Sequence, residues 1–276
     1  MKVECVNPIR SFKGRGTDYL LHHIDAPKRG LVCASAGNFG QGMAYAARKR
    51  GFRLTVYAAA NASALKVERM RALGAEVVLF GEDFDAAKDA ARSYAETVGA
   101  TFVEDGSLTR IAEGAGTIAY ELTERPSAFD AIVVPLGDGA LVSGISAWVR
   151  PAEPNARIIG VVAEGAPAME LSWRAGKPVS TESIATIADG IAVRVPVASA
   201  VDDVRNAVDD VMHVSDAEMV EGMRALFIDA GLVVEPAGAA GLAAAKKLSG
   251  ELAGKRVAVI ITGGNISPDR FRELVD

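Results

Sequence analysis

Lys13 is the residue of this chain with the most distinctive chemical setting. It lies in residues 7–15, NPIRSFKGR, where the Asn-Pro pair is typical of a turn and Ser11 is a suitable helix N-cap. The spacing predicts that Lys13 falls in the first turn of a helix, where the helix dipole and the neighbouring arginines disfavour an ammonium group. A neutral lysine amine is a nucleophile that attacks aldehydes. Taken alone, the stretch is far more typical of a solvated lysine among basic neighbours.

A second polar segment, residues 35–42 (SAGNFGQG), follows an apolar run expected to be a strand and precedes an expected helix. Proteins of the α/β class place ligand-binding loops at the carboxyl ends of their strands. The glycines let a flat polar ligand approach the backbone, and the Asn38 amide can donate a hydrogen bond to a phenolate-type oxygen. An ordinary strand-to-helix turn is the alternative for this segment alone.

Residues 137–141 (GDGAL) lie between the expected strand at residues 131–135 and a helix expected to begin near Ser143. Their backbone N–H groups can converge on a phosphate at the helix N-terminus. The segment lacks the lysine of a P-loop, and Val142 stands where a dinucleotide fingerprint needs glycine, so a single phosphate is indicated. The Asp138 carboxylate opposes an anion unless it points to solvent, and a plain tight turn is the alternative.

Two further segments supply polar groups at expected element ends. Residues 262–265 (TGGN) follow the apolar run 257–261, and the Thr262 hydroxyl can hydrogen-bond a neutral ring nitrogen without protonating it. A glycine turn after a core strand is the alternative there. Residues 235–239 (EPAGA) open an expected helix, and helix capping is the simpler interpretation of Glu235.

The elements that must position these segments alternate in type along the chain. Short β-rich apolar runs alternate with amphipathic or alanine-rich stretches, a pattern of βα units around a parallel sheet, so we predict the α/β class. The elements before residue 109 form one block, and those after it form a second. We expect these two blocks to be two lobes that pack intimately against each other. We expect strands at residues 31–34, 53–58, 75–80, 131–135, 157–162 and 256–261, and helices at 40–50, 63–73, 83–98, 110–121, 216–230 and 236–248.

Composition excludes several classes of function. The chain has 276 residues, 50% hydrophobic and 24% charged, enough for one large core or two linked cores. Its net charge of −5 and scattered basic residues exclude a nucleic-acid partner. The N-terminus is charged where a signal peptide needs an apolar run, and no stretch reaches the length of a membrane span, so we expect a cytoplasmic protein without membrane contact. Cys5 and Cys33 lack metal-ligand spacing and are expected to be buried free thiols.

Together these segments resemble the fold-type II pyridoxal phosphate enzymes of the threonine/serine dehydratase and serine racemase group. The resemblance implies a tryptophan synthase β-like fold of two lobes, each with a mainly parallel sheet flanked by helices. It implies a large cofactor-binding lobe of residues 1–28 and 110–276 and a small lobe of residues 29–109 that carries the asparagine loop. Because the group has additional residues before the lysine motif, we expect an N-terminally short form of this fold. The matching segments are, in order, SFKGRG, SAGNFGQG, GDGAL, AEGAPAM, TIADGIAV, EPAGA and TGGN.

The resemblance also implies a role for each matched residue. Lys13 is the expected Schiff-base lysine and catalytic residue, and Ser35, Ala36 and Gly37 are the expected substrate-binding residues. The expected pyridoxal 5'-phosphate contacts are Phe12 beside the ring, Asn38 at the 3-hydroxyl, Thr262 at the pyridine nitrogen, Glu235, and Gly137, Asp138, Gly139, Ala140 and Leu141 around the phosphate. Glu164, the Ala168 carbonyl and Glu170 form an expected Mg²⁺ or Ca²⁺ site, with a solvated acidic helix face as the alternative. A homodimer is expected because it is the commonest arrangement of soluble enzymes.

Ala36 distinguishes between two activities of this group. Racemases resemble dehydratases but usually have a serine at this position, whose hydroxyl is an acid/base on the face opposite the lysine. A methyl group carries no proton, so we expect an L-threonine/L-serine dehydratase (ammonia-lyase) that eliminates the β-hydroxyl and yields a 2-oxo acid and ammonia. Phe39 and Asp138 depart from the residues usual in the group. The alternatives are a serine/threonine racemase or another pyridoxal phosphate β-elimination or replacement enzyme, and a non-catalytic truncated homologue.

Overall fold

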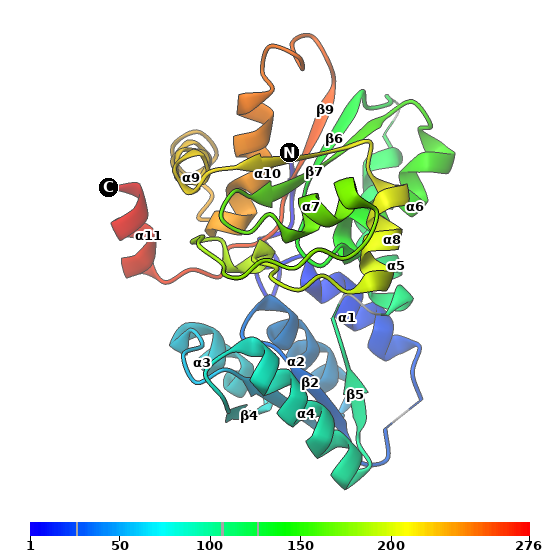
Figure 1. Cartoon of the computed structure of the whole chain (residues 1–276), viewed down its shortest axis with the longest axis vertical. Helices are drawn as coiled ribbons and strands as arrows, with labels where there is room; N and C mark the ends of the chain where they lie inside the picture. The colour runs from blue at the N-terminus through cyan, green and yellow to red at the C-terminus, as the bar shows by residue number, and fades with distance from the viewer. Residues whose placement is uncertain (26, 106–107, 126) are drawn as a thin grey trace. The chain divides into compact units, whose positions relative to one another are not determined.

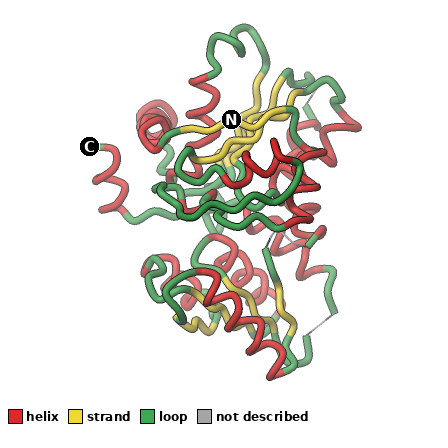
Figure 2. Tube along the Cα trace, viewed as in Figure 1, coloured by secondary structure: helices red, strands yellow, loops and turns green. Residues whose placement is uncertain are grey.

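The computed structural model of the chain describes residues 1–25, 27–105, 108–125 and 127–276, which divide into two compact units. The large unit comprises Met1–Phe12 and Ala115–Asp276, and the small unit comprises Lys13–Gly114. Each unit contains a parallel sheet with helices beside it (Figures 1 and 2). This confirms the predicted α/β class and the prediction of a mainly parallel sheet in each lobe.

Near the N-terminus, the boundary between the compact units falls between Phe12 and Lys13. Residues from Lys13 onward are grouped with the small unit because helix α1 (Lys13–His22) packs against helix α2 (Asn38–Arg50). Lys13 therefore shares a compact unit with the asparagine loop. The lobe boundaries that the resemblance implies, residues 1–28 and 110–276 for one lobe and 29–109 for the other, stay a prediction.

The small unit is built on a sheet with the strand order β4-β3-β2-β5, in which all neighbours are parallel. Helix α4 places Ala87, Ala91 and Ala95, which are four residues apart and share one helix face, against this sheet. The strands are β2 (Leu31–Ala34), β3 (Leu54–Ala58), β4 (Glu76–Leu79) and β5 (Thr101–Val103), and the further helices are α3 (Ala64–Ala72), α4 (Phe84–Val98) and the first part of α5 (Thr109–Thr123), which belongs to the large unit from Ala115 onward.

The sheet of the large unit has the order β1-β9-β6-β7-β8, again with parallel neighbours. Its central strands are uninterrupted apolar runs because both of their faces are buried. Ile132 and Val134 pack with α6 and α8, whereas Val133 packs with α10 on the opposite face. The strands are β1 (Lys2–Val3), β6 (Ala131–Pro135), β7 (Arg157–Ala163), β8 (Asp210–Val214) and β9 (Val257–Ile261), and the helices are α6 (Ala140–Ala152), α7 (Ala168–Ala175), the 3₁₀ helix η1 (Asp189–Ile191), α8 (Ala198–Ala207), α9 (Asp216–Ala230), α10 (Pro236–Lys247) and α11 (Pro268–Val275).

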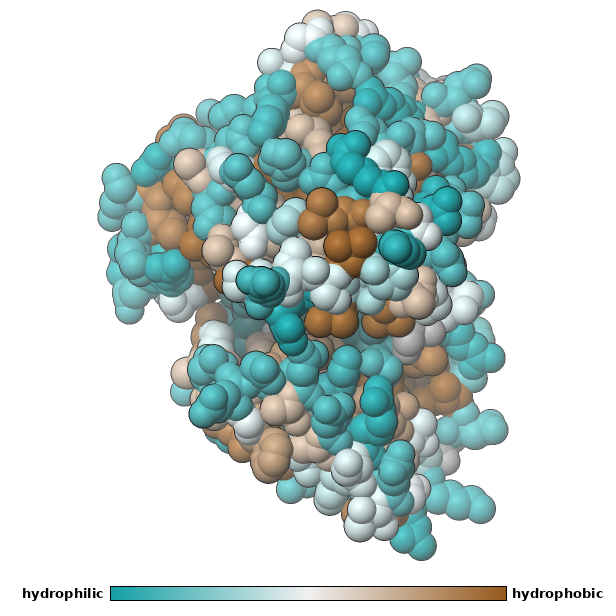
Figure 3. All heavy atoms as spheres, in the orientation of Figure 1, coloured by the Kyte–Doolittle hydropathy of each residue, from teal (hydrophilic) through white to brown (hydrophobic). Residues whose placement is uncertain are grey.

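The surface has ordinary polarity. On the face drawn in Figure 3, hydrophilic residues predominate and apolar residues form small groups.

Within the described ranges, no helix combines the length and apolar character that crossing a bilayer requires. Cys5 and Cys33 are both buried free thiols, which confirms that prediction.

Candidate active site

The turn before Lys13 is held by the Asn7 side chain. Its amide donates to the carbonyl oxygens of Glu4 at 2.8 Å and Ser11 at 3.0 Å, and its oxygen accepts from N–H groups inside the turn. Arg10, within the turn, has φ of 53°, in the left-handed region that residues other than glycine rarely adopt. Helix α1 then begins at Lys13, which confirms that Lys13 lies in the first helical turn. Ser11 is not the N-cap that the sequence predicts, because it lies two residues before the helix and forms a bridge with Gly263. The turn therefore sets the start of the helix that carries the lysine.

The asparagine loop, residues 35–42, connects β2 to α2 and is organised by Ser35. The Ser35 hydroxyl oxygen accepts hydrogen bonds from the N–H groups of Gly37 at 3.1 Å and Gly40 at 2.9 Å. A Cβ at Gly40 would lie 2.5 Å from Met70 Sδ, so this position has no room for a side chain. Ser35, predicted to bind substrate, thus shapes the loop that carries Asn38.

Gly42 lets α2 lie against the first turn of α1. A Cβ at this position would be 2.7 Å from Thr17 Oγ1 and 3.2 Å from the Lys13 carbonyl oxygen. Thr17 is fully buried, and its hydroxyl donates to the Lys13 carbonyl at 3.0 Å. The lysine and the asparagine loop, 25 residues apart between Lys13 and Asn38, are therefore held together by close helix packing.

Asp105 contacts Lys13 directly, and sequence reasoning missed it. Lys13 Nζ donates to Asp105 Oδ2 at 2.7 Å, and the two side chains are only 11% and 21% exposed. Asp105 follows β5, which pairs in parallel with β2 in the register Cys33 to Val103. The carboxyl ends of the two strands meet at one edge of the sheet, so Asp105 lies at the edge where the asparagine loop begins.

Two buried polar side chains, those of Lys66 and Gln41, belong to or lie beside the asparagine loop. Lys66 of α3 is 4% exposed, and its Nζ lies 4.0 Å from the point that a Cβ on Gly37 would occupy. Gln41 is 1% exposed, and its Nε2 is buried without a hydrogen-bond partner among the described residues. Buried donors are normally satisfied, so the Gln41 amide marks a place for an acceptor from a ligand. A positive charge and a spare donor suit a carboxylate.

The GDGAL segment leads into α6 in the large unit, as predicted, but the helix begins at Ala140, inside the segment, and not near Ser143. Gly139 is the N-cap with φ of 98°, and a Cβ there would lie 2.7 Å from Val204 Cγ2. Glycine is therefore required by both conformation and space. Ser143, one turn into the helix, has a buried Oγ that lacks a hydrogen-bond partner within the described part of the chain. A glycine-lined helix N-terminus with a spare hydroxyl suits one phosphate group.

Asp138 adopts an orientation that the sequence did not predict. An anion site at this helix end calls for a carboxylate turned to solvent, but Asp138 Oδ1 accepts a hydrogen bond from the Ala140 N–H at 2.9 Å. One N-terminal amide of α6 is therefore occupied by a protein carboxylate. This stabilises the helix end and competes with an added anion.

Phe12 and Thr262, both predicted to contact the cofactor ring, are neighbours in the large unit. The Phe12 N–H donates to the Thr262 carbonyl at 2.9 Å, and Ser11 forms an antiparallel bridge with Gly263. The Thr262 side chain is buried at the end of β9, and its hydroxyl donates to the Ala237 carbonyl at 3.3 Å. The single proton of that hydroxyl is directed at Ala237, so donation to a neutral ring nitrogen, as predicted, requires the hydroxyl to turn away from Ala237.

Glu235 occupies the N-cap position of α10 through its backbone. Its carboxylate makes no capping hydrogen bond in the described structure, and the residue is 3% exposed, so helix capping by the side chain is not its role. A Cβ at Gly238 would lie 2.2 Å from the Gly263 carbonyl oxygen, which shows how closely α10 packs on the TGGN segment. The EPAGA and TGGN segments are therefore in close packing contact.

Two of the predicted metal ligands have protein partners. Glu170 Oε1 accepts from Arg174 at 2.9 Å, and its Oε2 lies 3.3 Å from Nδ1 of His213. The Ala168 carbonyl accepts from the Ser172 hydroxyl at 2.6 Å. Among the described residues, no group of three or more His, Cys, Asp and Glu side chains could hold a metal ion. The site of Glu164, Ala168 and Glu170 stays a prediction.

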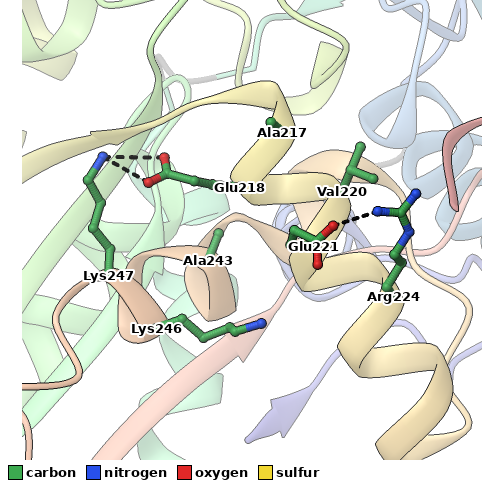
Figure 4. A pocket seen from close by; sticks show the side chains of 8 residues that line it. All are labelled: Ala217, Glu218, Val220, Glu221, Arg224, Ala243, Lys246 and Lys247. Atoms are coloured by element: carbon green, nitrogen blue, oxygen red, sulfur yellow. Dashed lines mark hydrogen bonds and ion pairs between the residues drawn. The ribbon is translucent and has the colours of Figure 1, made fainter.

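A separate surface pocket lies on α9 and α10, with a volume of about 530 Å³ (Figure 4). Four of its charged side chains form two pairs: Glu218 lies 3.1 Å from Lys247, and Glu221 pairs with Arg224 (Figure 4). None of the motif residues lines this pocket. The candidate active site is therefore assigned to the motif segments and not to this pocket.

Comparisons with known proteins agree with the motifs. A profile of the family described as pyridoxal-phosphate dependent enzymes matches residues 1–263. The chain is 37% identical to an L-threonine ammonia-lyase of Thermotoga maritima, over all of this chain and 69% of that protein.

Two solved structures share the fold. The processed form of threonine deaminase isoform 2 from Solanum lycopersicum superposes with a TM-score of 0.93 at 26% identity, over 99% of this chain and 76% of that one. Maize serine racemase superposes with a TM-score of 0.91 at 30% identity, over 98% of this chain and 84% of that one.

Proposed function

The chain belongs to the family of pyridoxal-phosphate dependent enzymes, and we propose that it is a threonine/serine ammonia-lyase. The observation that carries the proposal is the placement of Lys13. Its amine is mostly buried at the start of α1, and Gly42 packs that helix directly against the one that begins at Asn38. The similarity to the L-threonine ammonia-lyase supports the same reaction class.

The residues present fit pyridoxal phosphate. In the large unit, the N-terminal end of α6 with Gly139 and the spare Ser143 hydroxyl suits its phosphate, and Thr262 supplies a hydroxyl proposed for its ring. In the small unit, Asn38 supplies an amide proposed for its ring. Lys13 supplies the amine that would hold it. When bound, this cofactor withdraws electrons from the substrate Cα and so makes the Cα proton removable.

Side chains of the protein are proposed to remove the Cα proton and to bind the substrate carboxylate. Lys13 Nζ, once it has lost its proton, is the base that takes the Cα proton. The buried Lys66 ammonium beside Gly37 is suited to hold the substrate carboxylate, and Gln41 of the same loop has a spare amide donor for it. Loss of the β-hydroxyl as water then leaves an enamine, and tautomerisation of this enamine to an imine followed by hydrolysis with one water yields the 2-oxo acid and ammonia.

Racemisation is the second candidate because the chain is similar to maize serine racemase. Ala36 argues against it, since a methyl group cannot deliver a proton to the face of Cα opposite Lys13. A single incubation separates the two activities. The protein is supplied with pyridoxal phosphate and L-serine or L-threonine, and 2-oxo acid, ammonia and the chirality of the recovered amino acid are measured.

The ammonia-lyase predicts equal amounts of pyruvate and ammonia from L-serine, and of 2-oxobutanoate and ammonia from L-threonine, with no D-serine. D-serine as the main product would favour the racemase. Absence of turnover with the cofactor bound would favour the non-catalytic homologue. Lys13→Ala is the matched variant, and unchanged product formation by it would refute the mechanism.

Three finer features are part of the proposal. The homodimer rests on the frequency of that arrangement among soluble enzymes, and light scattering on the eluting protein tests it. A cytoplasmic location is a further part of the proposal, and fractionation of the source cells tests it. The Mg²⁺ or Ca²⁺ site at Glu164, Ala168 and Glu170 rests on its oxygen donors, and calorimetric titration with each ion tests it.

A further inference from the structure

Asp105 and Lys13 form an ion pair that is shielded from solvent. The distance of 2.7 Å between Nζ and Oδ2 is that of a charge-assisted hydrogen bond, and both side chains are largely buried. Surface pairs are weakened by water and salt, whereas a pair at this depth is screened much less. The contact therefore favours the ammonium form of the lysine.

The fold makes this contact through strand order. Because β5 lies beside β2 in parallel, Asp105 ends its strand next to the strand that leads into the asparagine loop. The fully buried Cys33 of β2 supports this placement, since burial and, to a smaller extent, the charge of Asp105 raise the pKa of its thiol. Asp105 therefore lies at the edge of the small unit's sheet where the asparagine loop begins.

Other charged groups on the elements around the pair are engaged in the structure. Asp18 of α1 pairs with Lys49 and Arg50 of α2, which lower its pKa against the opposing effect of burial. Glu104, the residue before Asp105, pairs with Lys88 and Arg92 of α4. Lys66 of α3 lies beside the asparagine loop, and Arg15 follows Lys13 on α1.

Asp105 opposes the effect of the helix on Lys13. The positive end of α1 favours a neutral amine at its first residue, whereas a carboxylate in contact with Nζ favours the ammonium form. An ammonium nitrogen has no lone pair and cannot attack an aldehyde. The amine must therefore leave the pair as a neutral group before it reacts.

We propose that Asp105 is a positioning residue that holds Lys13 as an ammonium group in the cofactor-free protein and thereby limits the rate at which this amine captures an aldehyde. The inference deepens the proposed function, and its link to the cofactor rests on that function. Its core concerns only the reactivity of one lysine, which can be measured without the cofactor.

The test is reductive methylation of the cofactor-free protein with formaldehyde and cyanoborohydride, followed by peptide mass spectrometry. The rate at Lys13 is divided by the rate at Lys49, a surface lysine of the same molecule with a 57% exposed side chain. Asp105→Asn removes the charge, Asp105→Glu retains it, and Glu104→Gln removes the adjacent carboxylate that pairs with Lys88 and Arg92 instead. Near neutral pH we expect Asp105→Asn to raise the methylation rate at Lys13 on the order of tenfold. The reason is that an adjacent opposite charge raises the pKa of an amine by about one pH unit or more, and its removal increases the neutral fraction by the same factor.

The pH profile separates charge from accessibility. If Asp105 acts through charge, the Asp105→Asn and wild-type rates converge at high pH, where the amine is neutral in both proteins, and Asp105→Glu and Glu104→Gln stay near wild type. An unchanged or lower rate in Asp105→Asn, or the same increase at every pH, would overturn the inference. If Asp105→Asn is unstable, Asp105→Ser provides the same charge removal.

A parallel measurement separates this inference from the proposed function. The rate at which pyridoxal phosphate develops its lysine-bound absorbance is recorded for the same variants. Faster methylation in Asp105→Asn with no cofactor band in any variant would refute the proposed function and leave the inference standing. Normal cofactor capture with unresponsive methylation would refute the inference and leave the function standing.

Discussion

Replacing Asp138 by asparagine is expected to tighten the binding of pyridoxal phosphate. In the structure the Asp138 carboxylate accepts a hydrogen bond from the Ala140 N–H at the N-terminal end of α6, where the phosphate is proposed to bind. Asparagine keeps an oxygen acceptor of the same size, so the cap of the helix is preserved. The substitution therefore removes the charge and little else.

The size of the effect follows from Coulomb's law. Two unit charges about 4 Å apart interact by about 1 kcal/mol in water and about 4 kcal/mol at an effective dielectric constant of about 20. Asp138 is partly exposed, so the lower part of this range applies. A gain of about 1.4 kcal/mol corresponds to a roughly tenfold lower dissociation constant.

The assay is a titration of cofactor-free protein with pyridoxal phosphate at low and high salt. Asp83→Asn is the matched control, because Asp83 is the N-cap of α4 and accepts from the Ala86 N–H at the same distance of 2.9 Å as Asp138 from Ala140. Only Asp138→Asn should tighten binding, and its advantage should shrink as salt increases. Unchanged or weaker binding by Asp138→Asn at low salt would refute the placement of the phosphate.

Three further substitutions test other parts of the site. Lys66→Met should raise the KM for L-threonine about tenfold or more while cofactor binding is kept, because it removes the buried charge beside the asparagine loop; an unchanged KM in steady-state assays would contradict this. Ala36→Ser should introduce formation of D-serine from L-serine, measured by chiral chromatography, and its complete absence would remove Ala36 as the reason for elimination. Gly139→Ala should lower the free energy of unfolding by about 1–2 kcal/mol, because its φ of 98° and the contact with Val204 exclude a methyl group. A melting temperature equal to that of wild type would argue against that conformation.

The sequence predicted where the polar segments lie in the fold. The asparagine loop follows β2, GDGAL follows β6 and TGGN follows β9, and each lies at the carboxyl end of a parallel strand. These strands are apolar runs that are almost wholly buried, so their hydrophobic pattern is strong. Strong patterns bounded by glycine-rich turns are what a single sequence reveals best.

The contacts that tune the site were not predicted. β5 has only the residues of Thr101–Val103, too few for a period to show, and without it the sequence gives no reason to place Asp105 beside Lys13. The pair spans 92 positions and depends on strand order, which no local pattern encodes. The orientation of Asp138 and the loop-shaping hydrogen bonds of Ser35 likewise depend on backbone geometry.

The most direct test of the central claim is the visible absorbance spectrum of the protein supplied with pyridoxal phosphate, recorded before and after addition of L-threonine. The sample is then reduced with borohydride and mapped by peptide mass spectrometry. The account predicts a lysine-bound cofactor band that changes on addition of the amino acid, a reduced adduct on Lys13, and loss of both in Lys13→Ala. A band that persists in Lys13→Ala, or an adduct on another lysine, would contradict it.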